Sequence, residues 1–323
     1  MRIWNGIDRY LDGPSHVVAS VGNYDGVHLG HREILRRIVE DAQRRDLASL
    51  LITFDPHPAV VVAPDRRPRH LQTRRQKLDS LAATGLTDLL VLGFTPELAA
   101  LDGEAFFASV LEPRIRFAAI HVGDNFRFGR ERSGDVETLI RIGKRLGFEV
   151  EGVPAVVIDG KTVSSTAIRR AVEAGKVEEA RRMLGRPFAA LGEVVPGEGR
   201  GAELQFPTAN VAVENEMIPA AGVYVTETVA LASRFPSVTN VGTRPTFGGK
   251  ELTIESHLLD FDGDLYTERV EIRFLARIRD EMRFASAVEL GDQIARDRAA
   301  AEGYFENMQL GAMDPESFTN RAG

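Results

Sequence analysis

Two histidines lie among closely spaced glycines near the start of the chain. His28 and His31 belong to the segment GNYDGVHLGH, which directly follows the apolar run HVVASV. Glycine lets a backbone approach a phosphate closely, a helix beginning here would add N–H donors, and two imidazoles supply more. The glycines concerned are Gly22, Gly26 and Gly30. The combination predicts a triphosphate site, and the alternative is an ordinary turn with capping histidines.

A second group of polar residues lies in the other half of the chain. A Gly-rich stretch that includes Gly199 and Gly201 leads into Phe-Pro-Thr-Ala-Asn, which ends at Asn210. In an extended segment Thr208 and Asn210 would point the same way, and their oxygens suit a hard cation such as Mg²⁺ shared with ATP phosphates. A Gly-rich turn before a strand with two polar positions is the alternative.

These residues need elements that hold them in place. The first half of the chain alternates short, β-branched apolar runs with stretches of helical period. This pattern predicts βα units and an α/β doubly wound parallel sheet, with strands at 16–22, 49–54, 88–94 and 118–124. Ligands of such sheets bind outside the carboxyl ends of the strands, so the polar segments that follow the strands should converge.

A predicted helical pair at 164–187, with Gly175 and Gly185 as stop signals, closes the first half of the chain. The second half has a different texture. Alternating segments punctuated by Gly and Pro follow and predict a C-terminal antiparallel β-barrel, with a terminal helix over 286–305 packed on it. We place the boundary after Arg186, which gives domains 1–186 and 187–323.

Composition limits the class of protein. The chain has 323 residues, 43% hydrophobic and 27% charged, which predicts two folded domains. We expect no secretory signal or membrane span, and zero Cys excludes disulfides and thiolate-bound metals and fits a cytoplasmic protein. The net charge of -7 argues against a nucleic-acid partner. The oligomeric state stays open.

The motifs together resemble those of a known family. GNYDGVHLGHREIL is similar to the adenylyltransferase signature of bacterial bifunctional riboflavin kinase/FMN adenylyltransferase (FAD synthetase), and three further segments agree in order: TFDPHP, VGDNFRFG and VSSTAIR. PTAN and the segments 240–249, 255–275 and 278–284 resemble its riboflavin kinase half. The resemblance implies that riboflavin and ATP give FMN in the barrel. FMN and ATP then give FAD and pyrophosphate in the α/β domain, and both steps use Mg²⁺.

For the first domain the resemblance implies specific roles. His28 and His31 would hold ATP phosphates and stabilise charge on the α-phosphorus, while the FMN phosphate is itself the nucleophile. Asn125 would orient ATP, or else be a turn residue, and Arg169 would hold phosphate. The other ATP ligands would be Asp25, Ser165 and Thr166, with Gly22, Gly26 and Gly30; the hydroxyls of 164–166 would also cap the following helix. Near the flavin would lie Phe54, His57 and Phe128, although core packing is an equal interpretation for the two Phe.

For the second domain, the resemblance makes Thr208 and Asn210 ligands of metal and nucleotide, with Gly199 and Gly201 beside ATP. Glu255 matches the general base that takes the proton of the ribityl hydroxyl during its attack on the γ-phosphorus. A solvated surface acid is the alternative. The flavin would be closed in by Arg279 and Phe284, for which barrel-to-helix packing is an equal interpretation.

Two positions depart from the family. A basic residue is frequent where Thr162 stands, with Lys161 as a possible substitute, and Gln205 stands where Gly is usual. Two other functions stay open: a nucleotidylyltransferase for another phosphorylated acceptor, such as nicotinate mononucleotide, phosphopantetheine or choline phosphate, or an inactive flavin-binding regulator. The first leaves PTAN and Glu255 without a purpose, and the second has to explain why every proposed ligand is present.

Overall fold

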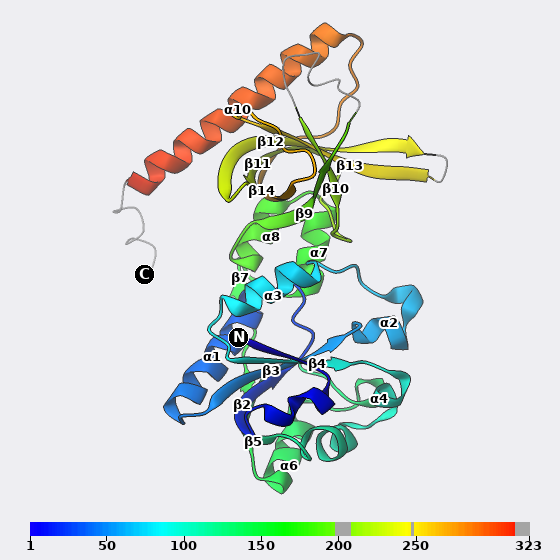
Figure 1. Cartoon of the computed structure of the whole chain (residues 1–323), viewed down its shortest axis with the longest axis vertical. Coiled ribbons are helices and arrows are strands. Elements are labelled where there is room, and N and C mark those ends of the chain that lie inside the picture. Colours follow the sequence, from blue (N-terminus) through cyan, green and yellow to red (C-terminus); the bar gives the residue numbers. More distant parts are fainter. Residues whose placement is uncertain (198–207, 247–248, 314–323) are drawn as a thin grey trace. The chain divides into compact units, whose positions relative to one another are not determined.

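The computed structural model describes residues 1–197, 208–246 and 249–313. By its internal contacts the chain forms two compact units, Met1–Ser165 and Thr166–Gly323 (Figure 1). This division groups the predicted helical pair with the barrel. Our assignment of 1–186 to adenylyl transfer and 187–323 to the kinase is a functional boundary, and it stays a prediction.

The first unit is built on one sheet of six strands in the order β1–β4–β3–β2–β5–β6, and all neighbouring strands run parallel. The strands are β1 (Arg2–Asn5), β2 (His16–Val21), β3 (Ala48–Asp55), β4 (Asp88–Gly93), β5 (Arg116–Gly123) and β6 (Glu149–Val153). The prediction of a doubly wound parallel sheet is confirmed.

The sequence pattern finds the four inner strands and misses both edge strands. β1 is only four residues long and largely exposed, and β6 alternates acidic with apolar residues. Inner strands are covered on both faces and therefore carry continuous apolar runs, whereas edge strands carry none. A prediction based on such runs stops one strand short at each edge.

Helices connect these strands. The longer ones are α1 (Leu29–Arg44), α3 (Arg74–Ala82) and α6 (Val136–Leu146). The shorter ones are η1 (Ile7–Asp12), α2 (Pro58–Val62), η2 (Pro64–Arg66), α4 (Pro96–Ala100), α5 (Gly103–Ala105), the π-helical η3 (Phe106–Leu111) and η4 (Arg130–Arg132). A small hairpin, β7 (Val157–Ile158) and β8 (Lys161–Thr162), precedes the end of the unit.

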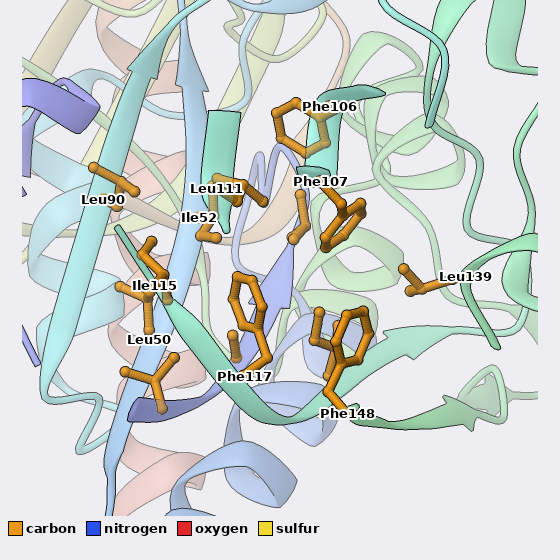
Figure 2. Packing of buried hydrophobic residues seen from close by; sticks show 14 of the residues in the cluster. Leu50, Ile52, Leu90, Phe106, Phe107, Leu111, Ile115, Phe117, Leu139 and Phe148 are labelled. Carbon is orange, nitrogen blue, oxygen red and sulfur yellow. The ribbon is translucent and has the colours of Figure 1, made fainter. Parts of the chain in front are cut away.

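Successive residues of the inner strands enter two different cores. Leu51 and Leu89 pack with apolar residues of α1 and α3 on one face of the sheet. Leu50 and Leu90 belong to a core on the other face, where they meet a group of phenylalanines from η3, β5 and the turn before β6 (Figure 2). Burial on both faces fixes the sheet, and with it the loops at its carboxyl edge.

The second unit contains the helices α7 (Ser165–Glu173) and α8 (Val177–Leu184) and a closed antiparallel barrel with the order β10–β13–β12–β11–β14–β9. Its strands are β9 (Phe188–Val195), β10 (Ala209–Val213), β11 (Gly222–Ala230), β12 (Ser233–Thr246), β13 (Gly249–Leu258) and β14 (Arg269–Arg279). The terminal helix is α10 (Ala287–Met313). Barrel and terminal helix are both as predicted.

Inside the barrel, five buried hydroxyls form a closed ring of hydrogen bonds with O···O distances between 2.6 and 3.0 Å. They belong to Thr226, Thr228, Ser237, Thr239 and Ser256. The alternate residues Val225 and Val238 pack on the opposite face, in the cluster that holds Tyr304 of α10. A hydroxyl can donate one bond and accept others, so a ring satisfies every member without water. The ring therefore fixes which side chains of β11, β12 and β13 point into the barrel.

Among the described residues, no helix combines the length and apolar character needed to cross a membrane.

An ion cluster around the buried residues Asp41 and His121 joins α1 to β5 and β6 in the first unit. Nε2 of His121 lies 3.0 Å from Asp41, and its Nδ1 lies 2.9 Å from Glu151. Arg44 and Arg45 donate to the same Asp41 carboxylate. Burial alone would raise the pKa of Asp41, but the hydrogen bonds from these two arginines and the histidine outweigh it and lower the pKa to about 2.

We therefore predict that Asp41→Asn destabilises the first unit in a pH-dependent way. A carboxyl with a depressed folded-state pKa contributes stability that is complete above pH ~5 and is lost as the pH falls towards ~2. The variant should lose about 2 kcal/mol at pH 7 and clearly less at pH 3. Trp4, the single Trp of the chain, lies in β1, so its fluorescence during urea unfolding reports on this unit.

The matched control is Asp79→Asn, because Asp79 is an exposed carboxylate of α3 in the same unit. It should change the unfolding free energy by no more than about 0.5 kcal/mol at either pH. An Asp41→Asn deficit of equal size at both pH values would show that the ion cluster does not depend on this charge.

Candidate active sites

The loop between β2 and α1 has an unusual backbone. Tyr24, Gly26 and Val27 have φ values of 51°, 86° and 38°. A left-handed conformation is strained for a β-branched residue such as Val27, so the surrounding structure must impose it. The loop ends at His28, the N-cap of α1, whose Nδ1 accepts a hydrogen bond from the N–H of His31 at 3.3 Å.

The side chains of this loop form a stack of three rings. His31 lies between Tyr24, at a centroid distance of 4.6 Å, and His28, at 3.6 Å and an interplanar angle of 15°. Burial lowers the pKa of His31 well below its usual value, and the charges of His28 and Lys77 act in the same direction. No described residue hydrogen-bonds the buried Nδ1 of His31. A buried polar atom with no partner needs an explanation, and a catalytic role is one that such exceptions commonly have.

Asp25 holds this loop from within. It is only 6% exposed, and both carboxylate oxygens lie 3.1 Å from the N–H of Leu71, just ahead of α3. Its backbone carbonyl accepts a hydrogen bond from the hydroxyl of Ser165 at 2.9 Å. The described contacts of Asp25 are thus with the protein itself, and its predicted role in binding ATP stays a prediction.

The hydroxyl residues of the VSST segment differ slightly from expectation. α7 begins at Ser165, so Ser165 and Thr166 lie in its first turn, and Ser164 alone of the three precedes the helix. The prediction that all three residues precede the helix is therefore wrong for Ser165 and Thr166, which lie inside it. Arg169 follows one turn after Ser165 on the same helix.

The predicted flavin neighbours fall into two groups. Phe54 is half-buried at the end of β3 with its ring 5.4 Å from that of Phe94, whereas Phe128 is buried and packs against Phe107 in the core. For Phe128 the packing interpretation therefore describes what its side chain does.

Asn125, the residue predicted to orient ATP, follows β5 and is exposed.

His57 caps α2 and faces the β2–α1 loop. Its Nδ1 accepts a hydrogen bond from the N–H of Ala59 at 3.1 Å. Its Nε2 lies 3.1 Å from the side-chain amide of Asn23. The segment TFDPHP is thereby joined to the GNYDG segment, as the convergence of strand-end loops predicts.

The barrel aligns three polar residues across three strands. In the register of the sheet, Glu255 of β13 is directly opposite Asn210 of β10 and, on its other side, directly opposite Asn240 of β12. Directly opposite residues share one face, with Cβ atoms roughly 5 Å apart. Because Ser256 points inward to the hydroxyl ring, Glu255 points outward, and all three are half-buried. Asn240 was not among the predicted site residues.

The amide of Asn210 occupies a defined place. A Cβ on Gly197 would lie 2.0 Å from its Nδ2, so glycine is needed for the amide to lie there. Thr208 immediately precedes β10. The predicted ATP neighbours Gly199 and Gly201, and the atypical Gln205, lie outside the described residues.

Comparisons with known proteins agree with both sets of residues. The family model of FAD synthetase matches residues 12–167, and that of riboflavin kinase matches 184–305. The bifunctional riboflavin kinase/FMN adenylyltransferase of Escherichia coli K12 is 38% identical over 94% of this chain and 98% of its own length. That of Pseudomonas fluorescens is also 38% identical, over 89% and 93%.

The chain belongs to the bifunctional riboflavin kinase/FMN adenylyltransferase family. It carries the adenylyltransferase part first and the kinase part second, and the prediction of a two-enzyme chain is confirmed. A solved structure entitled "Macrolide-efflux Protein from Streptococcus pneumoniae" is also similar, with a TM-score of 0.86, 29% identity, and coverage of 94% of this chain and 99% of that one.

In this family's kinase half, Arg279 and Phe284 are expected beside the flavin. Here the guanidinium of Arg279 forms a two-pronged ion pair with Asp297 of α10, with Nη2 2.7 Å from Oδ2 and Nε 3.0 Å from Oδ1. It also lies 5.9 Å from the ring of Phe284. These contacts are those of barrel-to-helix packing, and a flavin contact for either residue stays a prediction.

One residue of the adenylyltransferase half escaped the sequence analysis. Lys77 of α3 is half-buried, and its Nζ donates to the backbone carbonyl of Asn23 at 2.6 Å and to Thr53 Oγ1 at 3.1 Å. A lysine within an amphipathic helical stretch normally lies on the solvated face, so the sequence carried no signal for this position. Thr162, where a basic residue is frequent in this family, is exposed in β8 beside Lys161.

We predict that Gly197→Ala lowers riboflavin kinase activity without affecting folding. The new methyl group would displace the amide of Asn210, and because that side chain can rotate, the stability should change by less than about 0.5 kcal/mol. A displaced ligand typically lowers kcat/KM by roughly 10- to 100-fold. The measurement is FMN formation from riboflavin, with thermal unfolding in parallel.

Gly291→Ala is the control, because Gly291 lies in the same unit and a Cβ there would meet no described atom within 4 Å. It should retain full kinase activity. Wild-type FMN formation by Gly197→Ala would show that the position of the Asn210 amide does not matter for the kinase.

Proposed function

We propose that this chain converts riboflavin to FMN in its barrel and FMN to FAD in its α/β unit, using ATP in both steps. The observation that carries the proposal is that one chain holds both the stacked histidine pair at the start of α1 and the Asn210–Glu255 pair on the barrel. The order of the two matching family models supports the same assignment.

For adenylyl transfer, we propose that the phosphates of ATP bind at the N-terminus of α1. The N–H groups there and the rings of His28 and His31 would stabilise the charge that develops on the α-phosphoryl group. The FMN phosphate oxygen attacks the α-phosphorus, and the bond to the β-phosphate oxygen breaks to release pyrophosphate. An arriving polyanion favours the protonated form of His31, which burial and its neighbours disfavour in the free protein. Ser165, Thr166 and Arg169 would hold the departing pyrophosphate.

For the kinase, we propose that Glu255 removes the proton of the ribityl hydroxyl as its oxygen attacks the γ-phosphorus. ADP is the leaving group. The amide of Asn210 on the adjacent strand, with Thr208, would orient the triphosphate. The half-buried position of Glu255 supports this role, because a base must meet its substrate away from bulk water.

The donor set fits Mg²⁺ carried in by ATP. Among the described residues, no group of three or more His, Asp or Glu side chains is placed to hold a metal. Mg²⁺ needs few protein ligands when phosphates supply the rest, and the oxygens of Thr208 and Asn210 are of the hard kind it prefers. When bound, the ion would neutralise the charge of the transferred phosphoryl group.

We also propose a cytoplasmic location and no nucleic-acid or membrane partner. Zero Cys and the net charge of -7 support these assignments. Riboflavin, FMN and ATP are then the ligands that matter.

Incubation of the protein with riboflavin, ATP and Mg²⁺, followed by chromatography of the flavins, should yield both FMN and FAD. His31→Ala should lower FAD formation by at least ~100-fold, because a group that stabilises transition-state charge is lost. Glu255→Gln should lower FMN formation by roughly 100- to 10,000-fold, because the base is lost.

Each variant is the control for the other. His31→Ala should form FMN at the wild-type rate, and Glu255→Gln should form FAD at the wild-type rate when FMN is supplied. If either folded variant lost both activities, the assignment of one site to each unit would be wrong. A wild-type protein that binds flavins but turns over no ATP would support the inactive regulator instead.

A further inference from the structure

The ammonium of Lys77 is bonded to the loop of the proposed ATP site. Its Nζ is 2.6 Å from the carbonyl oxygen of Asn23 and 3.1 Å from Thr53 Oγ1. The Thr53 hydroxyl donates to the same carbonyl at 3.3 Å. Three elements therefore meet at this point: helix α3, strand β3 and the loop that leads to the stacked histidines.

The bonded carbonyl lies beside the strained part of the loop. Asn23 directly precedes Tyr24, whose φ is 51°, and Val27, at 38°, follows shortly after. Such conformations persist only where surrounding contacts impose them. The side chain of Asn23 makes a further contact, because its amide lies 3.1 Å from Nε2 of His57. Anything that moves the Asn23 peptide therefore moves both the histidine stack and a proposed flavin neighbour.

We propose that Lys77 is a positioning residue for adenylyl transfer, which fixes the ATP-binding loop through the Asn23 carbonyl and places a positive charge behind the histidine stack. The inference rests on the proposed adenylyltransferase function. It adds a residue that neither the motifs nor the comparisons assign.

The charged surroundings of Lys77 are mixed. Burial lowers its pKa from 10.5 to about 8, and Arg74 of the same helix acts in the same direction. Asp25 of the loop and Asp55 at the end of β3 favour the charged form. Its charge in turn disfavours protonation of His31. The ammonium is thus charged at neutral pH and becomes neutral at mildly alkaline pH.

The first test is Lys77→Met with Lys144→Met as the matched control, because Lys144 is an exposed lysine of α6 in the same unit. Lys77→Met should lower kcat/KM for ATP in FAD formation by roughly 100-fold, as expected for a displaced catalytic group. Lys144→Met should not change it. FMN formation should be unaffected in both variants and serves as the internal control.

The second test separates charge from simple packing. The wild-type kcat/KM for ATP in FAD formation should fall as the pH rises through about 8, because kcat/KM reports on groups of the free enzyme. Lys77→Arg keeps a charged donor that does not titrate in this range, so its alkaline fall should move to higher pH. A purely structural lysine would leave the position of that fall unchanged.

Wild-type FAD formation by Lys77→Met, or the same alkaline fall in Lys77→Arg as in the wild type, would overturn the proposal. If Lys77→Met fails to fold by Trp4 fluorescence, the comparison of the two pH profiles still decides it. A wild-type chain that forms FMN but no FAD at any pH would contradict the adenylyltransferase function itself, which distinguishes that failure from the failure of this inference.

Discussion

The left-handed turn between β2 and α1 is the constraint on which the first site depends. The β-branched residue Val27 is strained in the left-handed conformation that it adopts there, so contacts from outside the turn have to hold it. Leu71 binds the carboxylate of Asp25, Ser165 binds its carbonyl, and Lys77 binds the carbonyl of Asn23. These partners come from distant parts of the sequence, so the conformation of the turn depends on the fold of the whole unit.

In the barrel, the alternation of side chains along each strand fixes the position of the proposed base. Ser256 is fixed in the inner ring of hydroxyls, so its neighbour Glu255 has to face outward, and the register sets it between Asn210 and Asn240. A shift of one residue would bury the carboxylate and expose the hydroxyl. The ring is therefore as important to the position of the proposed base as any contact made by Glu255 itself.

The sequence could predict what depends on local pattern. Apolar runs gave the inner strands, Gly175 and Gly185 end α7 and α8 with φ values of 69°, and the motifs around His28 and Asn210 gave the family. It could not predict what depends on pairing. The edge strands β1 and β6 lack apolar runs, the bond between Asp25 and Leu71 spans 46 positions, and Asn240 gains its meaning from a strand register that no single segment encodes. Nothing in the sequence around Lys77 distinguishes it from an ordinary solvated lysine of an amphipathic helix.

The two proposed sites differ in residue types because their nucleophiles differ. The phosphate of FMN is already ionised near neutral pH, so adenylyl transfer needs cationic and N–H donors and no base. The stacked rings of His28 and His31 supply N–H donors, and Lys77, which is bonded to the same loop, supplies a cation. The ribityl hydroxyl of riboflavin still carries its proton, so phosphoryl transfer needs a carboxylate within reach. Glu255 lies on the barrel between the amides of Asn210 and Asn240. A basic stack in the first unit and an acid among neutral amides in the second are what these two chemistries require.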